Sequence, residues 1–320
     1  MNVMETVLRK KIDPYLSLEN LSAIASEALR KNVRAGSKKT LLGGCWNRVI
    51  GVTLEGGFPD LVFKIGAETG DARIAREFKV LEYFASRTGF PVPHPYLLES
   101  SGRIIPGTVL VMEKTRGNVL HQIYHNLTPG MRNSISEQIA HLVGKLHERT
   151  SLGFGGVECD TSELITSWSD FWLPRFDRVL EEVKESGLLD TLFLSEIESA
   201  RELFAGFLNI GQKSTLLHYD VWSGNIMIGF NKNEPSVTGF VDVQGYWGDY
   251  ARELSFMELF GTADPRFYEI YPRNQAADEG LELRKSIYNL KMNLKHITMY
   301  PAEQYYRRGA RNCLRTILSA

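Results

Sequence analysis

Apolar residues recur at helical spacing along Leu18–Leu29, which predicts an amphipathic helix in this segment. Two stretches with strand character follow, Arg48–Leu54 and Leu61–Ile65, and a loop rich in glycine joins them. Helical spacing returns over residues 72–85, and Thr108–Met112 is a short apolar stretch between glycines. After the first helix, the pattern therefore predicts the order strand, strand, helix, strand.

The composition of the chain becomes helical after Gly117. One apolar stripe contains Ile135, Ile139, Leu142 and Leu146, residues 168–208 predict one or two helices, and residues 280–299 predict another. Two short strands, 225–228 and 237–241, lie between these helices with a turn-rich segment joining them. We therefore expect an α+β chain of two lobes: a small β-rich lobe over residues 1–114, with a hinge at its end, and a larger helical lobe over residues 115–320.

The overall charge is nearly balanced, since 37 Lys and Arg face 38 Asp and Glu in 320 residues. This balance predicts neither nucleic acid nor an anionic membrane surface as a partner. No apolar run reaches the roughly 18 residues of a membrane span, and Met1–Lys11 lacks the apolar core of a secretory signal. Three widely separated cysteines form neither a disulfide framework nor a metal-ligand pattern, so we expect a cytoplasmic protein.

The sharpest chemical signal is the segment Leu216–Ile226, in which His218-x-Asp220 is followed by Asn225. Phosphoryl transfer to a hydroxyl requires one carboxylate that orients the attacking oxygen, and a second carboxylate with an amide to hold metal ions. Asp220 fits the first role, while Asn225 and Asp242 fit the second because Mg²⁺ prefers oxygen ligands. A hairpin of the two short strands would bring Asn225 near Asp242. Each of these residues alone is also common in capped turns.

Three further segments fit the same chemistry, although each alone is also compatible with an ordinary turn, solvated lysine or strand end. Lys64 lies between apolar residues in a predicted strand, and Glu77 on the next helix could fix its direction toward phosphate oxygens. The turn at Gly43-Gly44 could bring backbone N–H groups to phosphates. The strand end at Met112-Glu113 is a place where adenine could pair with the backbone.

With these residues together, the sequence resembles the aminoglycoside phosphotransferase superfamily and, within it, the fructosamine kinase family. The family block Leu-Leu-His-Gly-Asp-Leu-Trp-Ser-Gly-Asn appears here as Leu216–Asn225, and the following block appears as Asp242–Gly261. The resemblance extends from about residue 20 to about residue 300. It implies a protein-kinase-like fold and phosphorylation of a small-molecule hydroxyl with ATP and Mg²⁺.

The resemblance also implies a role for each candidate residue. Asp220 is then the catalytic base, and Asn225 and Asp242 are the metal ligands. Lys64, positioned by Glu77, contacts the nucleotide phosphates. The remaining nucleotide-binding candidates are Gly43, Gly44, Met112 and Glu113.

The chain departs from the family pattern beside the base, where Tyr219 replaces glycine, and at Glu253, where the family has aspartate and where a structural role in holding the loop is expected. Val243-Gln244 also differs from the usual residues after the metal-binding aspartate. The leading hypothesis is a kinase of a sugar-like or amine-bearing acceptor. The alternatives are an aminoglycoside kinase, a choline- or homoserine-type amino-alcohol kinase, and a pseudokinase that binds nucleotide without turnover.

Overall fold

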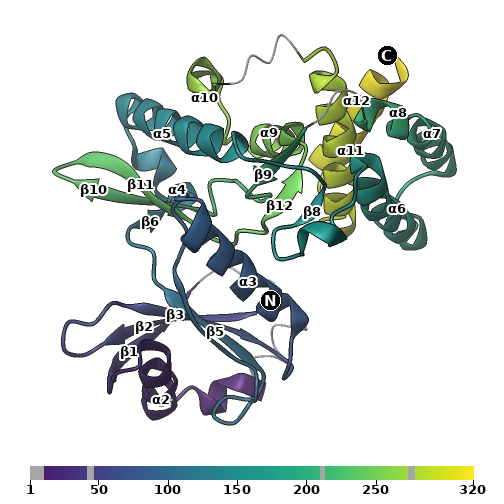
Figure 1. Ribbon diagram of the computed structural model, residues 1–320. Helices are drawn as coiled ribbons and strands as arrows, with labels where there is room; N and C mark the ends of the chain where they lie inside the picture. Colours follow the sequence, from purple (N-terminus) through teal and green to yellow (C-terminus); the bar gives the residue numbers. More distant parts are fainter. Residues whose placement is uncertain (1–10, 42–46, 210–212, 273–277) are drawn as a thin grey trace. The chain divides into compact units, whose positions relative to one another are not determined.

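The computed structural model describes residues 11–41, 47–209, 213–272 and 278–320 of the chain (Figure 1). The chain divides into two compact units. Unit 1 comprises Met1–Gly117 together with Met227–Gly229 and Thr238–Val243. Unit 2 comprises Asn118–Ile226, Phe230–Val237 and Gln244–Ala320. Unit 1 thus includes two short late segments that the predicted division at residue 114 did not assign to it.

Unit 1 is built on a five-stranded sheet with the strand order β1-β2-β3-β5-β4, in which neighbouring strands are antiparallel. Its elements in chain order are η1 (Asp13–Tyr15), α2 (Leu18–Leu29), β1 (Ala35–Thr40), β2 (Arg48–Leu54), β3 (Leu61–Gly66), α3 (Ala72–Arg87), β4 (Pro95–Glu99) and β5 (Thr108–Glu113).

The central strand β3 determines how unit 1 is packed. Every residue of β3 is buried, and Leu61, Phe63 and Ile65 join the core that contains the apolar face of α2. Because side chains alternate across a strand, Val62 and Lys64 lie on the opposite face. The helix α3 packs beside β3, β4 and β5. Lys64 is therefore a buried cation in an otherwise apolar strand.

Unit 2 is mainly helical, and loops connect its short strands. Its elements are β6 (Asn118–Val119), α4 (Leu120–Ile123), η2 (Tyr124–Asn126), α5 (Pro129–His147), β7 (Thr150–Ser151), β8 (Gly155–Gly156), η3 (Thr161–Glu163), α6 (Trp168–Ser186), α7 (Thr191–Arg201), α8 (Phe204–Leu208), β9 (Ser214–Leu217), β12 (Tyr246–Gly248), α9 (Tyr250–Leu259), α10 (Pro265–Ile270), α11 (Leu281–Met299) and α12 (Gln304–Leu318). The adjacent strands β10 (Ile226–Asn231) and β11 (Glu234–Phe240) contribute to both units.

A buried polar network fixes the start of α9 in unit 2. Asp249 caps α9 by accepting a hydrogen bond from the Ala251 N–H at 3.0 Å. The same carboxylate accepts from Arg284 at 2.8 Å and from the Tyr288 hydroxyl at 2.6 Å, both on α11. Because all of these groups are buried and paired, the network holds α9 against α11 in one register.

The predicted helix over 18–29 and the strand over 48–54 are confirmed, and the strand over 61–65, the helix over 72–85 and the strand over 108–112 are each one or two residues longer than expected. The order strand, strand, helix, strand was incomplete, because β1 and β4 also belong to the sheet. In β1 only Ala35 is buried, so this edge strand has no apolar alternation that a sequence pattern could reveal. The segment 168–208 contains three helices rather than one or two.

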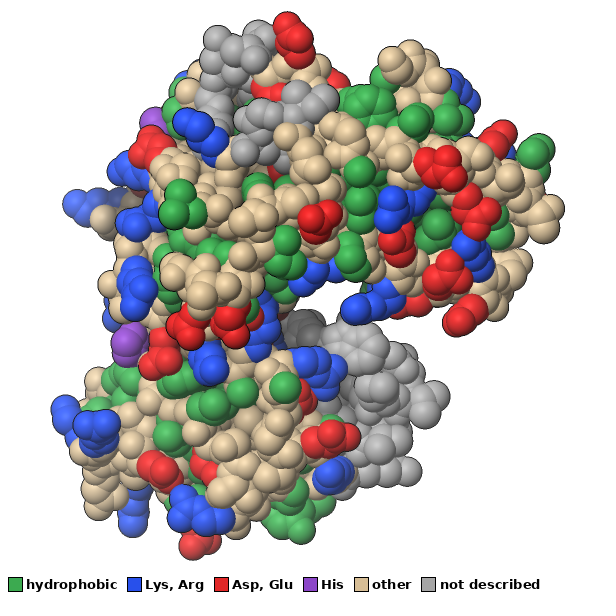
Figure 2. All heavy atoms as spheres, turned by 45° about the vertical axis from the view of Figure 1, so that its right-hand side comes forward, with side chains coloured by type: hydrophobic (Ala, Val, Ile, Leu, Met, Phe, Trp, Pro, Cys, Tyr) green, Lys and Arg blue, Asp and Glu red, His purple; other side chains and the backbone are tan. Residues whose placement is uncertain are grey.

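The face of the molecule drawn in Figure 2 shows Lys and Arg side chains interspersed with Asp and Glu side chains, as the balanced composition suggests. Within the described ranges, none of the helices combines the length and the apolar character that crossing a membrane requires.

Candidate active site

In unit 1, the ammonium group of Lys64 lies between two carboxylates. Its Nζ is 2.7 Å from Glu77 Oε2 and 2.8 Å from Oε1, and it is 2.7 Å from Asp242 Oδ1. Lys64 comes from the face of β3 that points away from α2. Glu77 comes from the second turn of α3, and Asp242 follows β11. The pair of Lys64 and Glu77 that the sequence predicted is thus formed, and Asp242 joins it.

The charges in this group explain the protonation of Lys64. Burial alone would lower the pKa of Lys64, but the negative charges of Asp242 and Glu77 outweigh burial and raise it. Burial raises the pKa of Glu77, while Lys64 opposes that rise. Lys64 therefore remains a cation, which is the form that binds phosphate oxygens.

In unit 2, the segment His218–Asn225 forms a loop between β9 and β10, and we call it the catalytic loop. The side-chain amide of Asn225 donates to Asp220 Oδ2 at 2.8 Å and to the Asp220 carbonyl at 3.0 Å. The Asp220 N–H donates to His218 Nδ1 at 3.2 Å. Gly224 is required because a Cβ at this position would lie 2.2 Å from the Trp222 ring. The loop thus fixes the direction of the Asp220 carboxylate.

A buried carboxylate on α9, Glu253, holds the backbone of the catalytic loop. Glu253 Oε1 accepts from the His218 N–H at 3.2 Å, and Oε2 accepts from the Tyr219 N–H at 2.9 Å. Although burial opposes ionisation, the neighbouring His147 and His218 and the Tyr219 N–H lower the pKa of Glu253. The structure therefore agrees with the expectation that Glu253 has a structural role, and it adds His147, which sequence reasoning had not assigned to the site.

Tyr219 has a backbone conformation that favours glycine, with a φ of +76°. A non-glycine residue at positive φ costs about 1–3 kcal/mol when no contact offsets it. The Tyr219 ring packs against Tyr246, with ring centroids 4.6 Å apart, and the guanidinium carbon of Arg252 lies 4.0 Å from its centroid. The glycine in the family pattern thus has a conformational reason, and here side-chain contacts support a tyrosine in its place.

The candidate adenine segment forms the end of β5. Met112 is opposite Val62 of β3 and is buried. The Glu113 N–H donates to the His94 carbonyl at 2.8 Å. The Glu113 N–H is therefore already engaged and is not available to pair with an adenine. The other nucleotide-binding candidates, Gly43 and Gly44, lie outside the described residues.

Comparison with known proteins decides the family. The sequence model of the family described as "Fructosamine kinase" matches residues 17–320. This chain belongs to the fructosamine kinase family. A protein of Vibrio parahaemolyticus, described as a probable ketoamine kinase, is 27% identical over 220 residues, which cover 64% of this chain and 72% of the relative. The enzyme class expected from the sequence, a small-molecule kinase, is thereby confirmed.

Solved structures confirm the protein-kinase-like fold. A candidate fructosamine-3-kinase from Thermobifida fusca superposes with a TM-score of 0.72 at 18% identity, over 95% of this chain and 100% of that chain. The aminoglycoside phosphotransferase APH(2")-IIa, solved in complex with gentamicin, gives a TM-score of 0.63 at 15% identity, over 95% and 97% of the two chains.

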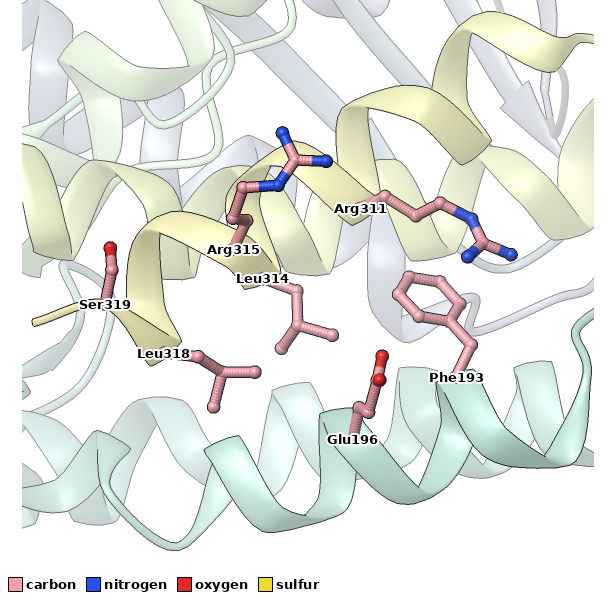
Figure 3. A pocket seen from close by; sticks show the side chains of 7 residues that line it. All are labelled: Phe193, Glu196, Arg311, Leu314, Arg315, Leu318 and Ser319. Carbon is pink, nitrogen blue, oxygen red and sulfur yellow. The ribbon is translucent and has the colours of Figure 1, made fainter.

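Two cavities in unit 2 of this kinase differ in their relation to the catalytic loop. A cavity of about 430 Å³ lies between α7 and α12, and Figure 3 shows Phe193 and Glu196 facing Leu314 and Arg311 across it. None of its lining residues is a predicted site residue. A smaller cavity of about 210 Å³ includes Ser223 of the catalytic loop in its lining.

Three acidic residues that follow Asp242 in the sequence are all engaged within unit 2, so we asked whether they could hold a cationic acceptor. Asp249 pairs with Arg284, and Glu253 accepts from the catalytic loop. Glu258 pairs with Lys285 at 2.6 Å and also accepts from the Tyr268 hydroxyl. These carboxylates therefore stabilise the fold, and this arrangement does not favour a cation-binding pocket made from them.

We expect Glu253→Gln to lower the free energy of unfolding by about 1.5–3 kcal/mol, because two backbone donors lose a charged acceptor. The turnover number should fall about tenfold or more, since the catalytic loop loses its fixed orientation. Urea unfolding and steady-state kinetics measure the two effects.

The direction in which stability changes with pH is a second test of the role of Glu253. Its pKa is lowered in the folded state, so its contribution is present above the ordinary value of 4.5 and is lost as the pH falls through the folded-state pKa. The stability difference between wild type and Glu253→Gln should therefore shrink in acid. Glu258→Gln, on the same helix but remote from the loop backbone, is the control. Equal kinetic effects of the two substitutions would contradict the assigned role.

Proposed function

We propose that this fructosamine kinase family member transfers the γ-phosphoryl group of ATP to a hydroxyl of a ketoamine, with Asp220 as the catalytic base. The observation that carries the proposal is the hydrogen bond from Asn225 to Asp220 Oδ2, which directs the carboxylate within the catalytic loop. The ion pairs of Lys64 with Glu77 and Asp242 support the assignment of a phosphate-binding lysine in unit 1.

The proposed reaction breaks one bond and forms another. Asp220 orients the acceptor hydroxyl and takes its proton as the oxygen attacks the γ-phosphorus. The bond between that phosphorus and the β,γ-bridging oxygen breaks, and ADP leaves with the electron pair. Lys64 contacts the nucleotide phosphates, and Glu77 keeps its ammonium group in place.

The donors of Asn225 and Asp242 fit Mg²⁺, which supplies charge neutralisation for the phosphates when it is bound. The Asn225 NH₂ group donates to Asp220, which leaves the amide oxygen as its metal-binding atom. Asp242 contributes a carboxylate whose side chain is 42% exposed. Asn225 belongs to unit 2 and Asp242 to unit 1, so their expected proximity stays a prediction. A cytoplasmic location also stays a prediction.

The alternatives from the sequence lead to different results in one assay. An aminoglycoside or amino-alcohol kinase would phosphorylate those acceptors in preference to ketoamines, and a pseudokinase would bind ATP without turnover. The engaged state of Asp249, Glu253 and Glu258 disfavours a polycationic acceptor held by these residues. A panel of ketoamines, aminoglycosides, amino alcohols and sugars, assayed by coupled ADP release, separates these functions.

Asp220→Asn should lower the turnover number for a ketoamine by about 10²–10⁴-fold, because the isosteric amide cannot accept the hydroxyl proton. The affinity for ATP, measured by calorimetry, should change little. Asp170→Asn, an exposed position in the first turn of α6, is the matched control. A turnover number for Asp220→Asn that equals that of the control would exclude Asp220 as the base.

Lys64→Met should raise the KM for ATP by about tenfold or more, because a charge-assisted contact with phosphate is lost. The KM for the ketoamine should change far less. Lys114→Met is the control, since this lysine pairs with Asp60 in the same unit but is 40% exposed. If both substitutions alter the KM for ATP equally, Lys64 does not have the assigned role.

A further inference from the structure

Four cations on three helices of unit 2 have no carboxylate partner in the described part of the chain. Arg175 and Arg178 belong to α6, Arg252 belongs to α9 and Lys291 belongs to α11, and we call them the basic cluster. Within the described residues, none of the ion pairs includes a member of this cluster. The neighbouring Lys295 differs, because it pairs with Glu182 at 2.6 Å.

Arg252 is the buried member of the basic cluster, with 6% of its surface exposed. Its guanidinium carbon lies 4.0 Å from the ring centroid of Tyr219 and 4.8 Å from that of Phe256. Its Nη1 atom is buried and has no hydrogen-bond partner among the described residues, and the same is true of the Tyr219 hydroxyl. A buried guanidinium donor without a partner is costly, and a ligand oxygen would remove that cost.

Lys291, like Arg252, lies among cations with no negative charge to balance them in the described residues. Burial and the nearby Arg252, Arg175, Lys295 and Arg178 lower the pKa of Lys291 to about 7. Its ammonium group lies 5.7 Å from the Trp172 ring centroid. An anion bound among these residues would restore the balance of charge.

Ring contacts connect the basic cluster to the catalytic loop. Tyr219, which precedes the base Asp220, packs against Tyr246, and Tyr246 packs against Phe171 with centroids 5.8 Å apart. Arg175 lies over Phe171, its guanidinium carbon 3.7 Å from the centroid. Aromatic side chains thus extend from the base to two members of the cluster.

We propose that Arg252, Arg175 and Lys291 form a subsite for an anionic group of the acceptor, so that the preferred ketoamine carries a carboxylate or a phosphate. This inference rests on the proposed function, because it assigns a substrate class to the same site. A ketoamine formed from a free amino acid carries a carboxylate close to its amine, whereas one formed from a lysine side chain within a protein does not. The subsite therefore selects free, acidic ketoamines.

The test compares acceptors that differ only in charge. Purified full-length protein is assayed with ATP and either the ketoamine of glucose and glycine or that of glucose and glycinamide, and a third acceptor carries a phosphate on the sugar with the glycinamide group. Wild type should favour at least one anionic acceptor over the neutral one by about tenfold or more in kcat/KM, mainly through KM. The anionic acceptor that wild type prefers shows whether the subsite binds the carboxylate of the amino acid or a phosphate on the sugar.

Variants connect the preference to the basic cluster. Arg252→Met should reduce the anionic-to-neutral ratio of kcat/KM to about one, Arg252→Lys should restore part of it because the charge returns, and Lys291→Met should give a smaller reduction. Arg311→Met is the matched control. It is also an arginine over an aromatic ring, 4.6 Å from the Phe193 centroid, but it lies on α12 and pairs with Asp190.

Several outcomes overturn the subsite. Equal use of charged and neutral acceptors by wild type would do so, and so would an unchanged ratio in Arg252→Met. If Arg252→Met raises the KM for ATP but leaves the anionic-to-neutral ratio of kcat/KM unchanged, the basic cluster binds the nucleotide and not the acceptor. Calorimetric binding of the glycine and glycinamide ketoamines to Asp220→Asn protein measures the same preference without turnover. Absent turnover of every ketoamine would refute the proposed function, while that binding ratio still decides the subsite.

Discussion

The catalytic loop depends on one interaction, in which Glu253 accepts two hydrogen bonds from the loop backbone. The carboxylate comes from α9, whose first turn is fixed by Asp249 and by its bonds to α11. Buried polar contacts thus hold α9 to α11 and hold the catalytic loop, next to Asp220, to α9. Because each of these groups is paired, loss of one partner leaves another buried and unsatisfied. The direction of Asp220 is therefore a property of the whole helical unit as well as of the local sequence.

Much of this site could be predicted because its chemistry restricts residue types. Spacing within the chain singled out Asp220 and Asn225 as candidates, and their side chains are hydrogen-bonded in the structure. A pairing of Lys64 with Glu77 was expected from their places in a strand and the next helix, and it is formed. One element that was missed, the edge strand β1, has a weak pattern because it is largely polar. The helix α12 was also missed, although its buried residues Ala310, Leu314 and Ile317 recur at helical spacing between arginines. Local pattern cannot reveal an element whose position depends on its neighbours.

Other features of the site could be understood only from the three-dimensional structure. The sequence marked Tyr219 as unusual, but only its φ of +76° explains why the family pattern has glycine there. The sequence alone also does not show which way the acidic residues after Asp242 point. In the structure, Asp249, Glu253 and Glu258 accept hydrogen bonds or form ion pairs. Arg252 on α9 lies over two aromatic rings, and its Nη1 has no hydrogen-bond partner among the described residues. This difference motivates the proposal that the acceptor carries an anionic group.

In the proposed function, this kinase moves a phosphoryl group from ATP to a hydroxyl of a ketoamine. The most direct measurement incubates the purified protein with ATP, Mg²⁺ and a ketoamine, and follows the products by phosphorus NMR and mass spectrometry. We expect one ADP for each ketoamine that gains a single phosphoryl group. The new phosphorus signal should be coupled to a proton of the sugar carbon that carries the modified hydroxyl. ADP formation without a phosphorylated ketoamine, or transfer to the amine nitrogen, would contradict it.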